Sequence, residues 1–200
     1  MEQNLDLLRQ EIVDKSLQAF REGLFSGTSG NMSCRVAPDE MLITPTSVRY
    51  DVLRARDIVR MKLDGTVLEG DLQPSSEWRM HAAVYEAYGE TNAVFHTHSP
   101  YATAFAVVRA SIPAVLIESC VFLGGDIRCA DYAAPGTKEV GVNAVPVLKD
   151  RGGCTLANHG VLAVGKDLAQ AYLRAEYIED VAKIYTYAKS IGTPVALDTL

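Results

Sequence analysis

Apolar side chains at near-helical spacing predict five helices along the chain. The first helix precedes Gly23, which stands where a C-cap is expected, and its apolar positions are Leu5, Leu8, Ile12, Leu17 and Phe20. The other four are predicted over 74–88, 101–110, 136–150 and 167–190. A proline and two serines mark the start of the second, Pro146 predicts an irregularity in the fourth, and the last is long and amphipathic.

Short runs of apolar and β-branched residues, broken by Pro, Asp and Gly, predict the strands. They cover 32–36, 41–44, 58–62, 66–68 and 92–98. Residues 154–165 add two short strands about a turn at 158–160. Strands therefore cluster centrally with helices before, between and after them, which is typical of an α/β or α+β fold in layers.

Composition and charge narrow the class of protein. With 200 residues and 48% hydrophobic composition, the chain is long enough for one sizeable core, so we expect one domain over 1–200. The net charge is -6 and the basic residues are scattered, which argues against nucleic-acid and membrane partners. The first twenty residues mix acidic with apolar positions, unlike a signal peptide, and no apolar stretch approaches the length of a membrane span.

The spacing of the four cysteines indicates the redox state of the cellular compartment. Cys34, Cys120, Cys129 and Cys154 lie far apart among apolar neighbours and form no CxxC pair. Free thiols in a reducing cytoplasm are the favoured interpretation, with disulfides as the alternative.

Three histidines and one glutamate form a candidate metal site. His96 and His98 are two apart in a predicted strand, so both imidazoles point to one face, and His159 lies in the predicted turn. Glu77 lies in the first turn of the second predicted helix. Three nitrogens and a carboxylate suit a catalytic zinc with an open position, although a His-x-His pair alone also occurs as two hydrogen-bonded histidines. His81 shares a helix face with Glu77, but its apolar neighbours favour a packed or partly exposed histidine outside the site.

Three uncharged polar segments are candidates for phosphate binding. Their backbone amides, hydroxyls and carboxamide suit a dianion, and the residues are Thr28, Gly30, Asn31, Thr46, Ser47, Ser75 and Ser76. Each segment alone also fits an ordinary turn or helix cap. Glu77, next to Ser76, would then stand between phosphate and metal as a general acid or base; its alternative role is to complement the helix dipole.

The chain resembles the class II aldolase/adducin family from about Leu5 to Lys189. The resemblance is carried, in order, by GTSGNMSCR, MLITPTSVRY, PSSEWRMHAAVY, AVFHTH, SIPAV, GTKE and ANHGVLAVG. It implies a three-layer αβα sandwich around a largely antiparallel sheet, assembled as a homotetramer with active sites at subunit interfaces. It also implies one Zn2+ per chain on His96, His98 and His159, with Glu77 as catalytic acid/base and additional metal ligand, and phosphate and substrate contacts from the seven polar residues above.

Within the family, the motifs are most similar to aldolases that cleave a deoxyketose 1-phosphate such as L-fuculose 1-phosphate. The chain differs from them in having Ser47 in place of a glycine, in lacking an interface tyrosine within IPAVLIESCVFLGG, and in ending without a longer C-terminal tail. Glu118 in that segment is a candidate for a local role. The alternatives are a 4-epimerase acting on L-ribulose 5-phosphate, where an aspartate replaces Glu77, another sugar-phosphate lyase or decarboxylase, and a non-catalytic adducin-like interaction module.

Overall fold

One eight-stranded sheet organises the computed structural model, which describes residues 2–197; Met1 and 198–200 of the expected domain lie outside it. The strands are β1 (Asn31–Ala37), β2 (Glu40–Ile43), β3 (Val59–Lys62), β4 (Val67–Glu69), β5 (Ala93–Thr97), β6 (Cys129–Ala130), β7 (Gly153–Leu156) and β8 (Gly160–Gly165). Their spatial order is β4-β3-β2-β1-β5-β8-β7-β6. Among the strands within 2–197, only the β6–β7 pair is parallel, which confirms the largely antiparallel sheet.

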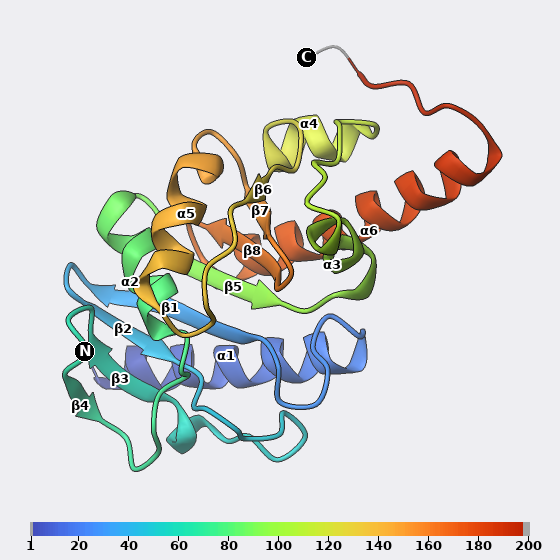
Figure 1. The fold of residues 1–200 in the computed structure, drawn as a ribbon. Helices are drawn as coiled ribbons and strands as arrows, with labels where there is room; N and C mark the ends of the chain where they lie inside the picture. The colour runs from blue at the N-terminus through green and yellow to red at the C-terminus, as the bar shows by residue number, and fades with distance from the viewer. Residues whose placement is uncertain (1, 198–200) are drawn as a thin grey trace.

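Helices cover both faces of the sheet (Figure 1). The helices α1 (Glu2–Arg21), α3 (Pro100–Val107), α4 (Ile117–Leu123) and α6 (Leu168–Ile191) contribute to one hydrophobic cluster, and α2 (Trp78–Ala87) and α5 (Lys138–Leu148) to the other. Strand β5 joins the two clusters, because Phe95 packs in the first and Val94 in the second. This alternation follows from the two-residue period of a strand and confirms the three-layer sandwich.

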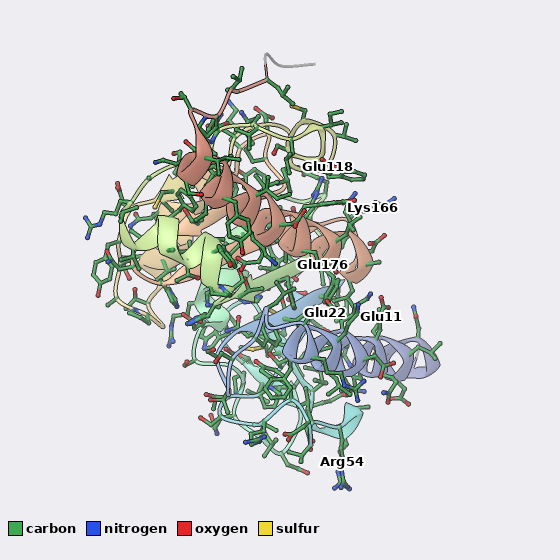
Figure 2. All side chains as sticks on the ribbon, turned by 90° about the vertical axis from the view of Figure 1, so that its right-hand side faces the viewer. Glu11, Glu22, Arg54, Glu118, Lys166 and Glu176 are labelled. Atoms are coloured by element: carbon green, nitrogen blue, oxygen red, sulfur yellow. The ribbon has the colours of Figure 1, made fainter. Side chains whose placement is uncertain are left out.

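Acidic side chains meet where α1 and α6 face each other. Figure 2 shows Glu22, just after α1, near Glu176 of α6. Burial and then the charge of Glu22 raise the pKa of Glu176. The Tyr172 hydroxyl donates a hydrogen bond to Glu22.

None of the helices within 2–197 is long and apolar enough to cross a membrane.

The second predicted helix begins later than the sequence suggested. It starts at Trp78, and Glu77 occupies the N-cap position with φ -98° and ψ 11°, so its placement in the first helical turn was wrong. The reason is a tertiary contact: the Ser75 amide donates to the Thr44 carbonyl over 3.0 Å, and Pro74 bridges to Pro45. Pro74 and Ser75 therefore pair with the segment that follows β2, and residues 76–77 form a turn before the helix begins.

Smaller differences concern short elements and helix α5. The sequence did not predict α4 or the two-residue β6, nor the short 3-10 helix Ala55–Asp57. Helix α5 continues through Pro146, and the face that includes Val140, Ala144 and Leu148 remains buried on both sides of the proline.

All four cysteines are free, as expected, and burial raises the pKa of Cys34 to about 12.

Candidate active site

Glu77, His96, His98 and His159, here named the donor cluster, offer one ligand atom each, all within 4.8 Å of one another. His96 Nε2 lies 3.0 Å from both His98 Nε2 and Glu77 Oε2. His159 Nε2 lies 3.1 Å from Glu77 Oε1. Three separate elements supply these groups: His96 and His98 come from the end of β5 and the residue after it, His159 from the β7–β8 turn, and Glu77 from the start of α2. The structure thus brings together the four residues that the sequence singled out.

The sheet fixes the orientation of the His96 ring. Its Nδ1 lies 2.8 Å from the carbonyl oxygen of Val161, the residue opposite Thr97 on β8. A carbonyl only accepts, so Nδ1 donates its proton there, and in the neutral, metal-binding form of the ring Nε2 presents a lone pair to the cluster. Metal-binding histidines are oriented by the same kind of bond.

Electrostatics favour the forms that bind a cation. Burial alone would raise the pKa of Glu77, but His96 and His159 outweigh it and hold the pKa well below its ordinary value. Burial, followed by the charges of His96 and His159, lowers the pKa of His98 to about 4. An ionised carboxylate and a neutral imidazole are the protonation states of metal ligands.

The cluster also leaves buried polar atoms with incomplete hydrogen bonding. Among the described residues, His159 Nδ1 is buried and makes no hydrogen bond, and Glu77 Oε1 is buried with His159 Nε2, 3.1 Å away, beside it. Burying such atoms unpaired costs about 1–3 kcal/mol each, so a native site of this kind calls for a further partner. Three imidazole nitrogens and a carboxylate at one point fit a divalent transition metal such as zinc.

A cavity of about 330 Å3 adjoins the donor cluster. Its lining contains the seven polar residues expected to bind phosphate, here named the cradle: Thr28, Gly30, Asn31, Thr46, Ser47, Ser75 and Ser76. Glu77, His98 and His159 line the same cavity. No lysine or arginine contributes to this lining, so an anion in the cradle would be held by hydroxyl, carboxamide and backbone N–H donors.

Gly30 allows the loop that contains Thr28 and ends at Asn31 to approach the donor cluster. Its φ of +88° favours glycine, and a Cβ there would overlap the Phe25 ring and lie 3.0 Å from the His96 carbonyl oxygen. The Tyr50 hydroxyl donates to the Gly30 carbonyl over 2.5 Å and fixes the loop from behind. A side chain at this position would therefore displace Asn31 from the cavity.

Comparison with known proteins identifies the family of the chain. The family model described as class II aldolase and adducin N-terminal domain matches residues 10–186. The chain belongs to this family. It is 39% identical to the 5-deoxy-D-ribulose 1-phosphate aldolase of Bacillus thuringiensis serovar kurstaki, covering 94% of this chain and 89% of the relative. It is also 39% identical to the L-fuculose phosphate aldolase of Escherichia coli K12, covering 94% and 86%.

A solved structure confirms the class II aldolase fold. An L-fuculose 1-phosphate aldolase superposes with a TM-score of 0.91 at 38% identity, covering 96% of this chain and 90% of that one. The expected family, the resemblance to fuculose phosphate aldolases and the enzyme class of the family are therefore confirmed.

Sequence reasoning missed three residues of the cavity and one beside it. Ser29, Pro45 and Pro135 also line the cavity. Ser29 and Pro45 lie in polar segments that were singled out, whereas Pro135 follows β6 and carries no signal in its own segment. His81 stays outside the donor cluster, as expected, but it is fully buried and lies 2.5 Å from Asn31 through Nε2 and Oδ1.

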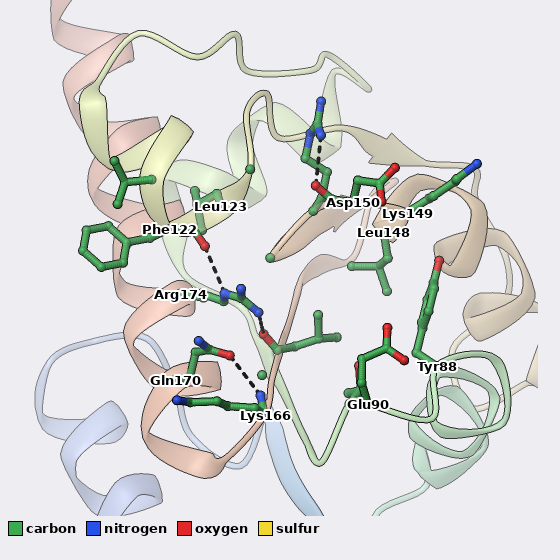
Figure 3. A pocket seen from close by; sticks show the side chains of 17 residues that line it. Tyr88, Glu90, Phe122, Leu123, Leu148, Lys149, Asp150, Lys166, Gln170 and Arg174 are labelled. Carbon is green, nitrogen blue, oxygen red and sulfur yellow. Dashed lines mark hydrogen bonds between the residues drawn. The ribbon is translucent and has the colours of Figure 1, made fainter. Parts of the chain in front are cut away.

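A larger cavity of about 590 Å3 lies elsewhere and contains no donor-cluster or cradle residue (Figure 3). Its polar side chains hold the surrounding backbone. Arg174 donates to the carbonyl oxygens of Phe122 and Val164 over 3.0 and 2.7 Å, and Gln170 accepts from the Lys166 amide over 2.9 Å. Arg174 and Gln170 are therefore engaged with backbone, and the residues that line this cavity include no histidine or cysteine.

Proposed function

We propose that the chain is a zinc-dependent class II aldolase that reversibly cleaves a deoxyketose 1-phosphate, such as L-fuculose 1-phosphate, to dihydroxyacetone phosphate and an aldehyde. The observation that carries the proposal is the single cavity shared by the cradle with Glu77, His98 and His159. The relatives support the substrate class, because their names specify 5-deoxy-D-ribulose 1-phosphate and L-fuculose phosphate.

Each part of the site has a defined task in this proposal. The three histidines would hold the zinc, with Glu77 as a further ligand until substrate enters, and the bound cation would polarise the ketose carbonyl. The cradle binds the phosphate and keeps the reacting carbons beside Glu77. When the bond between carbons 3 and 4 breaks, the hydroxyl on carbon 4 loses its proton and becomes the aldehyde carbonyl. Carbon 3 of dihydroxyacetone phosphate must gain a proton, which Glu77 carries, so that no net proton is gained or lost.

A homotetramer in the cytoplasm is part of the proposal. Apolar side chains are exposed on and after α3 and on α4, among them Val107, Val108, Ile117 and Val121. The Val107 carbonyl accepts a hydrogen bond from Asn158, the residue before His159, so this surface adjoins the donor cluster. Sedimentation of the purified protein tests the assembly, and a monomer at working concentration contradicts it. The four free thiols suit a reducing compartment.

A panel of phosphorylated ketoses tests the reaction. Purified metal-loaded protein is incubated with L-fuculose 1-phosphate, 5-deoxy-D-ribulose 1-phosphate and L-ribulose 5-phosphate, and the products are identified. An aldolase releases dihydroxyacetone phosphate and an aldehyde from a 1-phosphate, whereas a 4-epimerase converts the 5-phosphate without releasing fragments. No turnover of any ketose phosphate and no bound metal would instead support an adducin-like interaction module.

A further inference from the structure

Buried hydrogen bonds link Glu77 to the tyrosine at position 85. The Asn31 amide nitrogen lies 3.1 Å from Glu77 Oε2, and Asn31 Oδ1 lies 2.5 Å from His81 Nε2. His81 Nδ1 lies 2.6 Å from Ser33 Oγ, which in turn lies 2.7 Å from the Tyr85 hydroxyl. We name Asn31, His81, Ser33 and Tyr85 the hydrogen-bonded chain.

Matching periodicities of a strand and a helix build this chain. Asn31 and Ser33 are two apart on β1 and share one face, and His81 and Tyr85 are four apart on α2 and share one face. None of the four residues is more than 4% exposed. Buried polar groups with complete partners hold a single arrangement, because any other would leave one of them unpaired.

The direction of every bond follows from the carboxylate. An ionised Glu77 only accepts, so the Asn31 amide nitrogen must face it and Oδ1 must face His81. His81 therefore donates from Nε2 and accepts at Nδ1 from Ser33. The Ser33 proton is then in use, so Tyr85 donates to Ser33.

The protonation state of His81 agrees with this direction. Burial, followed by the charge of His96, lowers its pKa to about 3. The ring is therefore neutral near pH 7, as a donor at one nitrogen and an acceptor at the other must be.

We propose that His81 is a positioning residue for Glu77: by donating to Asn31 Oδ1 it holds the amide nitrogen of Asn31 toward the carboxylate. Without this donor, the Asn31 amide can rotate and present its oxygen to Glu77. Two acceptors would then face each other, and the carboxylate would move from its place beside His96 and His159. The predicted effect on turnover rests on the proposed function, in which Glu77 moves a proton.

Two substitutions at His81 separate positioning from packing. His81→Leu replaces the imidazole with an apolar side chain of moderate size and removes both hydrogen bonds. His81→Gln keeps a donor near the place of Nε2 and an acceptor for Ser33. We expect His81→Leu to lower kcat roughly ten- to hundred-fold, the usual effect of losing an outer partner of a site ligand. Because Asn31 also lines the cradle, a smaller rise in KM should accompany this fall. His81→Gln should recover most of kcat.

A matched control measures the cost of losing a buried hydrogen bond elsewhere. Tyr172→Phe removes the bond to Glu22 on the α1–α6 side of the sheet. We expect it to lower the melting temperature while leaving kcat unchanged. If His81→Leu likewise lost thermal stability but kept wild-type kcat, His81 would be structural only and the inference would be overturned.

A spectroscopic test on the wild type needs no substrate. The chain has four histidines, so nitrogen-15 labelling of histidine gives a spectrum simple enough to assign with a His81→Gln reference. In protein supplied with Zn2+ at about pH 7, we expect His81 to be neutral with its proton on Nε2. A proton on Nδ1, or a cationic ring, would overturn the inference even if the enzyme is an active aldolase. Absence of aldolase turnover in the wild type would contradict the proposed function and leave this result standing.

Discussion

The donor cluster and the cradle border one cavity but are built differently. Glu77 and His96 are buried, and regular secondary structure or its immediate ends hold the cluster. The cradle consists mainly of loop residues; Thr28, Ser47 and Ser76 are exposed, and the backbone reaches φ values of 60° at Ser47 and +88° at Gly30.

This difference separates two kinds of function. Buried side chains anchored by a sheet can be held to the accuracy that metal binding and proton transfer require. Exposed loop groups that offer neutral hydrogen bonds suit recognition of a phosphate, which many donors share. We therefore expect changes in the cluster to reduce metal content and turnover, and changes in the cradle to raise the Michaelis constant.

The largest effect is expected from His98→Ala. It removes one of three imidazoles, so bound metal should fall far below the level of about one ion per chain expected for the wild type. Activity should fall with it, because the cation contributes several kcal/mol to catalysis. Metal analysis after dialysis measures the bound metal, and a turnover assay measures the activity. His81→Gln is the matched control and should keep its metal; wild-type metal content in His98→Ala would show that the cluster is misassigned.

Glu77→Gln should have the next largest effect. It keeps the side-chain shape but removes the basic oxygen, so we expect turnover to fall roughly a hundred- to ten-thousand-fold with metal retained on the three histidines. If Glu77 only complemented the dipole of α2, turnover would be normal and stability slightly lower. Exchange of the hydroxymethyl proton of dihydroxyacetone phosphate with deuterium needs no aldehyde and isolates this step. Wild-type exchange in the variant would remove Glu77 from the mechanism.

The donor cluster was accessible from sequence because its signals are local. His-x-His on a strand and a histidine in a glycine-containing turn are visible without knowledge of the fold. The N-cap position of Glu77 was not, because it depends on the contact of Ser75 with Thr44, thirty-one positions earlier in the chain.

Features set by packing between distant segments could not be predicted. The partners of His81 depend on how α2 docks on β1, and Pro135 reaches the cavity only because β6 joins the far edge of the sheet. Helix α4 has seven residues and exposes Ile117 and Val121, so its pattern lacks a clear apolar face. Sequence spacing thus identifies the candidate metal ligands, whereas the residues that hold those ligands in place can be identified only from the tertiary structure.

In the cradle, Ser75→Ala should raise the Michaelis constant for a phosphorylated ketose. A charge-assisted hydrogen bond is worth about 1.5–3 kcal/mol, which corresponds to roughly a ten- to hundred-fold change. Ser75 Oγ also accepts from the Glu77 amide over 3.3 Å, so a smaller fall in kcat should accompany the change. Ser76→Ala is the matched variant without that bond and should alter the Michaelis constant alone. Equal kinetics on phosphorylated and dephosphorylated ketose would exclude phosphate recognition here.

The smallest effect concerns Ser47, where backbone strain and binding should respond in opposite directions. A left-handed conformation costs a residue with a Cβ about 1–2 kcal/mol, and glycine avoids this cost. Glycine also gives the unfolded chain more freedom, which removes about 0.4–1 kcal/mol of the gain. Ser47→Gly should therefore raise the free energy of unfolding by roughly 0.5–1 kcal/mol, measured by denaturant titration.

The Ser47→Ala variant separates the hydroxyl from the backbone, because alanine keeps the Cβ and the strain but loses Oγ. If Ser47 binds phosphate, both variants should raise the Michaelis constant by a similar factor, while only Ser47→Gly gains stability. A stability gain in both variants would show that the left-handed backbone is not the source of strain. An unchanged Michaelis constant in both would remove Ser47 from the cradle and place it at the solvent-exposed edge of the cavity.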